Sequence, residues 1–205
     1  MKIPFEITCV ILSGGKSSRM GEDKSLLPFS TSKTLIQYQY ERLKPYFKNI
    51  YISSKINKFD FLQTKFLILD ENQDVFSPIL ALDSIFDKLT NQKVFIITVD
   101  SPFVSIDTIS KLIEESADYD ICIAQSQKTH NLCGVFSSTI SKTIKSMIKN
   151  DIHKIFYLIK NNKYNIIEFP NNNEFMNINN KDEYKESLNY INKSNNSWNN
   201  IRYFL

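Results

Sequence analysis

Glycine is scarce in this sequence, with only four among 205 residues. Three of the four fall inside residues 12–24 (LSGGKSSRMGEDK), which follow directly on an apolar run from Ile7 to Leu12. A glycine lets backbone N–H groups approach a ligand without a side chain in between. Because the sequence offers this property almost nowhere else, residues 12–24 are the first candidate for a binding site.

Cysteine and histidine are also few, and their spacing excludes the common frameworks built from them. The cysteines are Cys9, Cys122 and Cys133, an odd number without a CxxC pair, and they lie mostly in apolar runs. The two histidines, His130 and His153, form no HxxxH or HExxH spacing. Neither a disulfide framework nor a structural zinc site is therefore expected. We expect three buried thiols in a reducing compartment.

Long apolar runs and a strong charge bias are absent as well. No segment reaches membrane-spanning length, and residues 1–6 (MKIPFE) lack the apolar core of a signal peptide. The net charge of +3, without a basic stripe, is too small to indicate nucleic-acid binding. These absences predict a cytoplasmic protein that binds neither membranes nor nucleic acids.

The remaining composition is that of an ordinary globular protein, with 42% hydrophobic and 23% charged residues. The length is sufficient for one domain with a sizeable core. We expect a single domain over residues 1–192 and a C-terminal tail over residues 193–205. The polar part of this tail, from Ser194, is predicted to be a linker, and its apolar end is predicted to dock on the domain.

Helical and strand patterns alternate along the chain, which is typical of βαβ units and a mainly parallel sheet. The apolar runs predict strands at residues 7–12, 49–53, 65–69, 93–99, 119–124, 133–136 and 165–169. Apolar residues at helical spacing predict helices at residues 34–47, 79–89, 105–115, 138–148 and 152–160. The sequence therefore predicts the α/β class.

Three of the predicted strands end in residues suited to bind a nucleotide. The first opens into Gly14-Gly15, another into Asp70-Glu71, and the strongest strand into Asp100-Ser101-Pro102. In parallel sheets, ligands bind outside the carboxyl ends of the strands. We therefore expect phosphate-binding groups and two carboxylates to meet at one edge of the sheet.

The residues after the first strand suit a triphosphate. Lys16, Arg19 and Lys24 supply positive charge beside the glycines. The spacing excludes a P-loop, because no Gly-Lys-Ser/Thr follows, and it excludes a dinucleotide fingerprint, because Gly-x-Gly-x-x-Gly is absent. Asp23 is interpreted either as an orienting group for Lys24 or Arg19, or as a solvated side chain.

Asp100 is the candidate metal ligand. A carboxylate at the end of an apolar strand is costly unless it binds something. Mg²⁺ commonly binds one or two protein carboxylates together with phosphate oxygens. The alternative is an aspartate that caps the following segment.

Residues 12–24 resemble the signature loop of the molybdenum cofactor guanylyltransferases, with Ser13 in place of the family's alanine. The resemblance continues through Leu69-Asp70 and residues 99–102 (VDSP) to residues 175–180 (FMNINN). It implies a Rossmann-like three-layer α/β/α nucleotidyltransferase fold with a mainly parallel mixed sheet. It also implies Mg²⁺-dependent transfer of GMP from GTP to the terminal phosphate of molybdopterin cofactor, with release of pyrophosphate.

The resemblance carries residue roles with it. Arg19, Lys24 and Asp100 would be catalytic, with Asp100 on the metal. The implied nucleotide-binding residues are Leu12, Ser13, Gly14, Gly15, Lys24, Ser53, Asp70 and Asp100. The implied partners are GTP, molybdopterin cofactor and the proteins that insert or receive that cofactor.

Departures from the family pattern leave alternatives open. Residues 77–81 (SPILA) stand where the family has Gly-Pro-Leu-Ala-Gly, and Ser53 stands where it tends to have asparagine. A cytidylyltransferase that uses CTP on molybdopterin or another phosphorylated acceptor is one alternative. A nucleotide-binding regulatory protein without turnover is another. His130 is interpreted as a contact to the second substrate or as a surface-loop residue, and His153 as structural.

Overall fold

The computed structural model describes residues 4–15, 20–71, 75–90 and 92–202, with the side chains of residues 194–202 excluded. Within these ranges the chain forms a seven-stranded sheet with the order β3-β2-β1-β4-β6-β5-β7. The strands are β1 (Thr8–Leu12), β2 (Ile50–Ser54), β3 (Leu67–Leu69), β4 (Lys93–Thr98), β5 (Ile121–Gln125), β6 (Thr129–Ser137) and β7 (Tyr164–Glu168).

The sheet is mainly parallel. β1 pairs in parallel with both β2 and β4, and β2 pairs in parallel with β3. β6 runs antiparallel to its neighbours β4 and β5, whereas β7 is parallel to β5. The order turns at β1, because β2 lies on one side and β4 on the other. This is the switch point at which open α/β sheets bind ligands.

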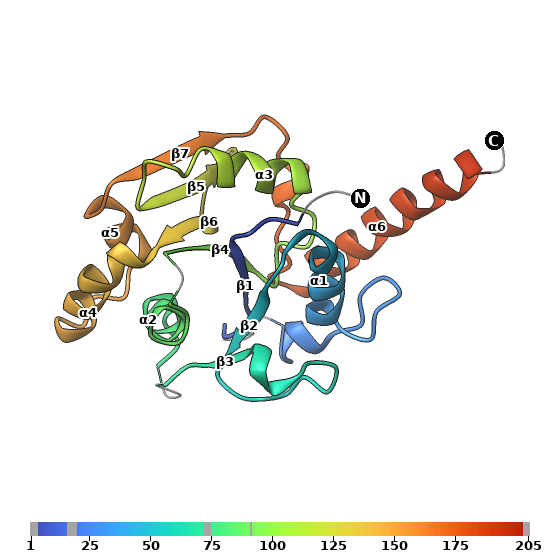
Figure 1. The fold of residues 1–205 in the computed structure, drawn as a ribbon. Helices are drawn as coiled ribbons and strands as arrows, with labels where there is room; N and C mark the ends of the chain where they lie inside the picture. The colour runs from blue at the N-terminus through green and yellow to red at the C-terminus, as the bar shows by residue number, and fades with distance from the viewer. Residues whose placement is uncertain (1–3, 16–19, 72–74, 91, 203–205) are drawn as a thin grey trace.

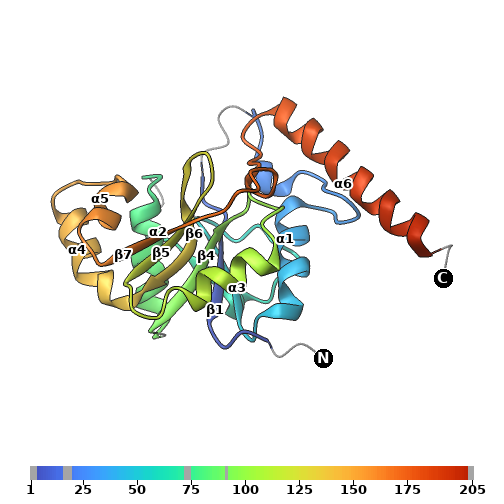
Figure 2. The ribbon, with the colours of Figure 1, turned by 90° about the horizontal axis from the view of Figure 1, so that it is seen from above.

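Helices cover both faces of the sheet (Figures 1 and 2). One hydrophobic core joins the sheet to helices α1, α3 and α6, and a second joins it to α2, α4 and α5. The helices are α1 (Leu35–Leu43), α2 (Pro78–Lys88), α3 (Ile106–Glu114), α4 (Ser141–Lys149), α5 (Ile155–Lys160) and α6 (Lys181–Arg202). The predicted α/β class and three-layer arrangement are confirmed.

The apolar runs of the central strands explain the two cores. Every residue of β1 is buried, with Cys9 and Ile11 facing the first core and Val10 and Leu12 facing the second. A strand covered by helices on both faces needs a continuous apolar sequence. The three cysteines are buried and free, as expected.

Polar caps set the starts of the main helices. The side chains of Thr34, Ser77 and Ser105 each accept a hydrogen bond from a backbone N–H of the first turn. The predicted helix over residues 34–47 is wrong in its last four residues, because the α-helix ends at Leu43. A 3-10 turn over Lys44–Tyr46 follows, and Pro45 within it has no N–H group to continue the helical bonds.

All seven observed strands differ from their predicted bounds by at least one residue, and two of the differences have a visible cause. Residues 64–66 form a 3-10 turn, so the strand predicted from residue 65 begins only at Leu67. The strand predicted at residues 133–136 is longer and starts at Thr129. The pairing of β6 with β5 shifts register between Ile123 and Ala124, and the two strands are paired on both sides of this irregularity.

The predicted linker from Ser194 is wrong, because α6 runs without a break to Arg202. Tyr184, Leu188 and Ile191 pack this helix on the first core, and its C-terminal part extends away from the body in both ribbon views. The predicted docking of Tyr203–Leu205 lies outside the described residues. The division into a domain and a tail at residue 192 stays a prediction. Within the described ranges, no helix is both long and apolar enough to cross a membrane.

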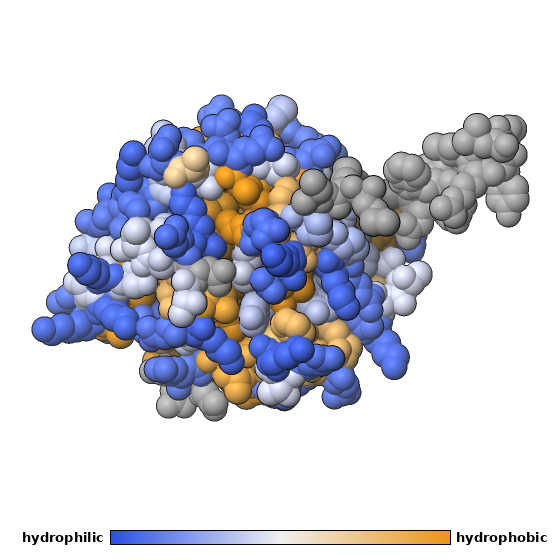
Figure 3. Space-filling view, in the orientation of Figure 1, coloured by the Kyte–Doolittle hydropathy of each residue, from blue (hydrophilic) through white to orange (hydrophobic). Residues whose placement is uncertain are grey.

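The face of the molecule in Figure 3 is hydrophilic over most of its area. Apolar residues are exposed on its lower part, over the side of the sheet where Figure 1 places β2 and β3. Ile56 and Leu69, which follow or end these strands, are among the exposed large apolar side chains. Neither of them belongs to the cores.

Candidate active site

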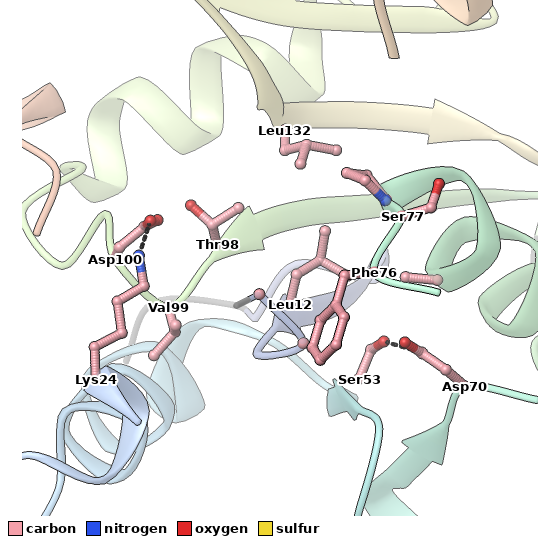
Figure 4. A pocket seen from close by; sticks show the side chains of 14 residues that line it. Leu12, Lys24, Ser53, Asp70, Phe76, Ser77, Thr98, Val99, Asp100 and Leu132 are labelled. Carbon is pink, nitrogen blue, oxygen red and sulfur yellow. Dashed lines mark hydrogen bonds and ion pairs between the residues drawn. The ribbon is translucent and has the colours of Figure 1, made fainter. Parts of the chain in front are cut away.

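A cavity of about 370 Å³ lies at the edge of the sheet where the parallel strands β1 to β4 end (Figure 4). Its walls come from these strand ends, from a 3-10 turn over Lys24–Leu26, from the start of α2 and from β6. The lining residues are Leu12, Gly14, Gly15, Lys24, Ser53, Asp70, Phe76, Ser77, Pro78, Ala81, Thr98, Val99, Asp100 and Leu132.

An ion pair forms one end of the cavity. Lys24 Nζ lies 2.5 Å from Asp100 Oδ2, and the two side chains are only 15% and 16% exposed. Lys24 comes from the loop after β1 and Asp100 from the end of β4, which neighbours β1 in the sheet. The sheet therefore brings together the cation and the carboxylate that the sequence placed 76 residues apart.

A segment from the C-terminal part of the chain holds this ion pair in place. Lys24 Nζ donates a second hydrogen bond to Ile178 O at 3.1 Å, and Ile178 N donates to Asp100 O at 3.0 Å. Next to it, Ser101 Oγ donates to Asn177 Oδ1 at 3.0 Å. Ile178 therefore binds both partners of the pair through its backbone, and Asn177 binds the residue after Asp100.

Asp23 fixes the turn that carries Lys24. Its carboxylate accepts hydrogen bonds from Ser25 N and Ser25 Oγ, and it pairs with Lys58. Burial by itself raises the pKa of Asp23, but the hydrogen bonds from Lys58 and Ser25 outweigh it and hold the pKa below its usual value. Asp23 therefore orients Lys24 through the turn that carries it and is not a solvated side chain, whereas its relation to Arg19 lies outside the described residues.

A second polar pair lies away from Lys24 and Asp100 (Figure 4). Ser53 Oγ donates to Asp70 Oδ1 at 3.2 Å, and the Asp70 side chain is buried. Burial raises the pKa of Asp70, and the hydrogen bond from Ser53 and the charge of Lys55 offset only part of that rise. A Cβ added at Gly14 would lie 3.4 Å from Asp70 Oδ2, so glycine keeps the approach to this carboxylate open.

Seven of the eight residues named from the sequence as nucleotide-binding line the cavity: Leu12, Gly14, Gly15, Lys24, Ser53, Asp70 and Asp100. Ser13 does not line it. The Ser13 side chain is buried, and its backbone N–H already donates to Ser53 O at 2.8 Å. Lys16 and Arg19 lie outside the described residues.

Three lining residues were missed by the sequence analysis: Phe76, Thr98 and Leu132. Thr98 directly precedes the Val99-Asp100 strand end and was therefore available to the same argument. Leu132 belongs to β6, and because β6 is antiparallel its amino-terminal half lies at the edge where the parallel strands end. Phe76 lies in the connection before α2, for which no periodic pattern exists.

His130 lies inside β6 and is buried, so the prediction of a surface loop is wrong. Its ring stacks on Phe175 at 4.3 Å between centroids, and its Nε2 lies 2.8 Å from Ser126 Oγ. Because Ser126 donates its proton to Asn172 Oδ1, the His130 Nε2–H is the donor to Ser126. Burial, assisted by the charge of Lys128, lowers the pKa of His130 to about 4.

Acidification is expected to destabilise the fold through His130. Between pH 6.5 and the folded-state pKa of about 4, the unfolded chain binds a proton that the folded chain does not. The free energy of unfolding should therefore fall by about 1–2 kcal/mol more between pH 7 and pH 5 than in a His130→Gln variant. Urea unfolding of both proteins at the two pH values measures this difference. Parallel pH profiles for the two proteins would contradict it.

His153 connects the start of α2 to the loop between α4 and α5. Its Nδ1 lies 2.9 Å from Ser77 Oγ, and its Nε2 lies 2.9 Å from Asp151 Oδ1. Because the carboxylate of Asp151 only accepts, the N–H at Nε2 is the donor in that bond. Ser77 lines the cavity, so His153 contributes to its wall through this serine.

Comparison with known proteins identifies the family. Residues 9–162 match the model of the MobA-like NTP transferase domain. A molybdenum cofactor guanylyltransferase of Campylobacter jejuni subsp. doylei is 37% identical over 185 residues, covering 88% of this chain and 95% of the relative. One from Helicobacter pylori strain G27 is 31% identical over 204 residues, covering 96% and 100%.

A solved structure shares the fold. The molybdopterin-guanine dinucleotide biosynthesis protein A of Archaeoglobus fulgidus superposes with a TM-score of 0.76 at 19% identity, covering 91% of this chain and all of that one. The family model spans β1, β4 and the strand ends that form the cavity. The chain therefore belongs to the family with a MobA-like NTP transferase domain and is a nucleotidyltransferase.

Proposed function

We propose that this enzyme transfers GMP from GTP to the terminal phosphate of molybdopterin cofactor and releases pyrophosphate. Relatives with 31% and 37% identity are named for guanylyl transfer to the molybdenum cofactor. The observation that carries the proposal is the cavity, which joins the Lys24–Asp100 pair to the buried Asp70 carboxylate. One end suits a triphosphate, and the other suits a base that presents hydrogen-bond donors.

Asp70 favours guanine among the nucleobases. The pairing edge of guanine carries two neighbouring donors, N1–H and the N2 amino group, and an ionised carboxylate has two oxygens that accept both. Adenine and cytosine present one amino group beside a ring nitrogen that is itself an acceptor. A carboxylate therefore binds their edges less well than the edge of guanine.

Asp100 is the residue that would hold a divalent metal ion. In the described part of the chain, no three carboxylate, thiol or imidazole groups gather into a site made of protein ligands alone. Mg²⁺ fits this donor set, because it accepts one carboxylate and completes its shell with phosphate and water oxygens. The carboxylate already holds a cation, the Lys24 ammonium, on the cavity wall. When bound, Mg²⁺ would neutralise charge on the triphosphate.

The chemistry requires little from the side chains. An oxygen of the terminal phosphate of the acceptor attacks the α-phosphorus of GTP. The bond from that phosphorus to the bridging oxygen breaks, and the electron pair leaves with pyrophosphate. A phosphate monoester has a second pKa of about 6, so the nucleophile is charged at neutral pH and needs no general base. Lys24, together with Arg19, would stabilise the charge on the leaving group.

The test is pyrophosphate release by the full-length enzyme in the presence of molybdopterin cofactor, with GTP, CTP and ATP compared. GTP is expected to be the substrate. Asp70→Asn should lower kcat/KM for GTP by about 5- to 150-fold, because an amide has one acceptor instead of two. The matched control Asp60→Asn changes an exposed aspartate that is not among the lining residues. Turnover with CTP but not GTP would establish the cytidylyltransferase alternative instead.

A further inference from the structure

The connection before α2 places an aromatic ring in the wall of the cavity. Phe76 is 44% exposed, although it lines the cavity together with Leu12 and Ala81. In the view of Figure 4 its ring lies between Leu12 and the Ser53–Asp70 pair. A large apolar ring with this exposure beside a polar pair is a surface on which a flat ligand can stack.

Lys55 holds this connection from the end of β2. Its side chain is buried, its Nζ donates to Val75 O at 2.6 Å, and the same nitrogen lies 4.5 Å from the centroid of the Phe76 ring. The lysine therefore fixes both the backbone before Phe76 and the ring itself. A cation over one face of an aromatic ring is held there by the ring quadrupole.

Ser77 holds the connection from the other side. Its hydroxyl accepts from Ile79 N at 3.2 Å, which caps α2, and it bonds to His153 at 2.9 Å. Residues 75–77 are thus bound to β2 through Lys55 and to the loop before α5 through His153. The ring is in place before any ligand arrives, so stacking on it costs little ordering entropy.

We propose that Phe76 is the platform on which the purine base of the nucleotide stacks, with Lys55 as the residue that positions it. This inference rests on the proposed function, in which the base lies beside Asp70. Phe76 would contact the face of the base and Asp70 its edge. Ser77 and Ala81 stand where the resembling family has glycines, so their side chains reduce close backbone approach to the base. The ring of Phe76 supplies an aromatic contact in its place.

Direct binding of a non-hydrolysable GTP analogue with Mg²⁺, measured by calorimetry, tests the platform. Phe76→Ala is expected to weaken binding by about 5- to 150-fold, the range found when a base–aromatic stack is removed. Phe76→Tyr and Phe76→Trp should bind as the wild type does, whereas Phe76→Leu should stay weakened. The loss should be larger for the GTP analogue than for a CTP analogue, because a purine offers more area to the ring.

Phe156 offers a matched control. It is also exposed, at 54%, and Lys160 lies over its ring at 5.4 Å, but it is on α5 and does not line the cavity. Phe156→Ala should leave nucleotide affinity unchanged. Lys55→Met should weaken binding in the same direction as Phe76→Ala but to a smaller extent, because the ring remains and only its positioning is lost.

Fluorescence separates stacking from a structural effect. In a variant with Phe76→Trp and the single tryptophan Trp198 replaced by phenylalanine, GTP is expected to quench the emission. The same background with Phe156→Trp should show no quenching. Normal GTP binding by Phe76→Ala, or binding without quenching of Trp at position 76, would overturn the platform. If the wild type itself binds no GTP, the proposed function is wrong, and the proposed role of Phe76 is wrong with it.

Discussion

Replacement of Asp100 by asparagine is expected to lower the turnover number by about 10²–10³-fold, the effect of removing one group that stabilises transition-state charge. The side chain keeps its shape but loses the charge that holds Lys24 at 2.5 Å. It would also lose the anchor for Mg²⁺, so the metal concentration required for half-maximal activity should rise. Pyrophosphate release measured across a Mg²⁺ titration gives both quantities.

The control for this variant is Asp118→Asn, which changes an exposed aspartate away from the cavity. Thermal unfolding of both variants verifies that the fold is retained. An Asp100→Asn enzyme with the Mg²⁺ dependence of the wild type would remove Asp100 from its proposed metal role. A large effect of Asp118→Asn would show that the loss is not specific to the site.

Gly134→Ala is expected to lower the free energy of unfolding by about 3 kcal/mol or more, at the upper end of the cost of overpacking. A Cβ at this position in β6 would lie 2.1 Å from Cys122 O and 2.8 Å from Ile123 Cα. Both are backbone atoms of β5, so no side chain can move aside. The strands would have to separate next to the register shift at Ile123. Urea unfolding measures the change.

Gly15→Ala is the matched control for this prediction, because a Cβ at Gly15 meets nothing within 4 Å among the described atoms. Its free energy of unfolding should stay within about 0.5 kcal/mol of the wild type. A small domain has only about 5–15 kcal/mol of stability, so failure of Gly134→Ala to fold is the stronger form of the same result. Wild-type stability for Gly134→Ala would contradict the close approach of β5 and β6.

The part of the site that the sequence predicted is the part fixed by parallel strands. Gly14, Asp70 and Asp100 each follow a strand. Parallel strands bring their carboxyl ends to one edge of the sheet, and this does not depend on the length or path of the connections between them. The class of the fold was predictable for the same reason, since the alternation of strands and helices is strong. The lengths of individual helices and strands were less predictable than the fold class. For example, α1 ends before Pro45, and the spacing of apolar residues does not show this end.

The residues that the sequence did not predict depend on tertiary geometry. Leu132 reaches the cavity because β6 is antiparallel, and strand direction cannot be read from an apolar run. His130 is buried because β6 starts earlier than its apolar residues indicate. Phe76 is held in place by the hydrogen bond from Lys55 to Val75 and by the capping bond of Ser77. No sequence pattern links Lys55 to the connection before α2, so this placement could not be predicted.

The bond from Lys24 to Ile178 has a consequence for the order in which the enzyme becomes competent. It joins residues 154 positions apart. A domain folds as a unit, and closing a loop of this length costs entropy that only the folded domain compensates. The two hydrogen bonds of Ile178, to Lys24 and to Asp100, are therefore expected to form with the whole domain and not with β1 to β4 alone.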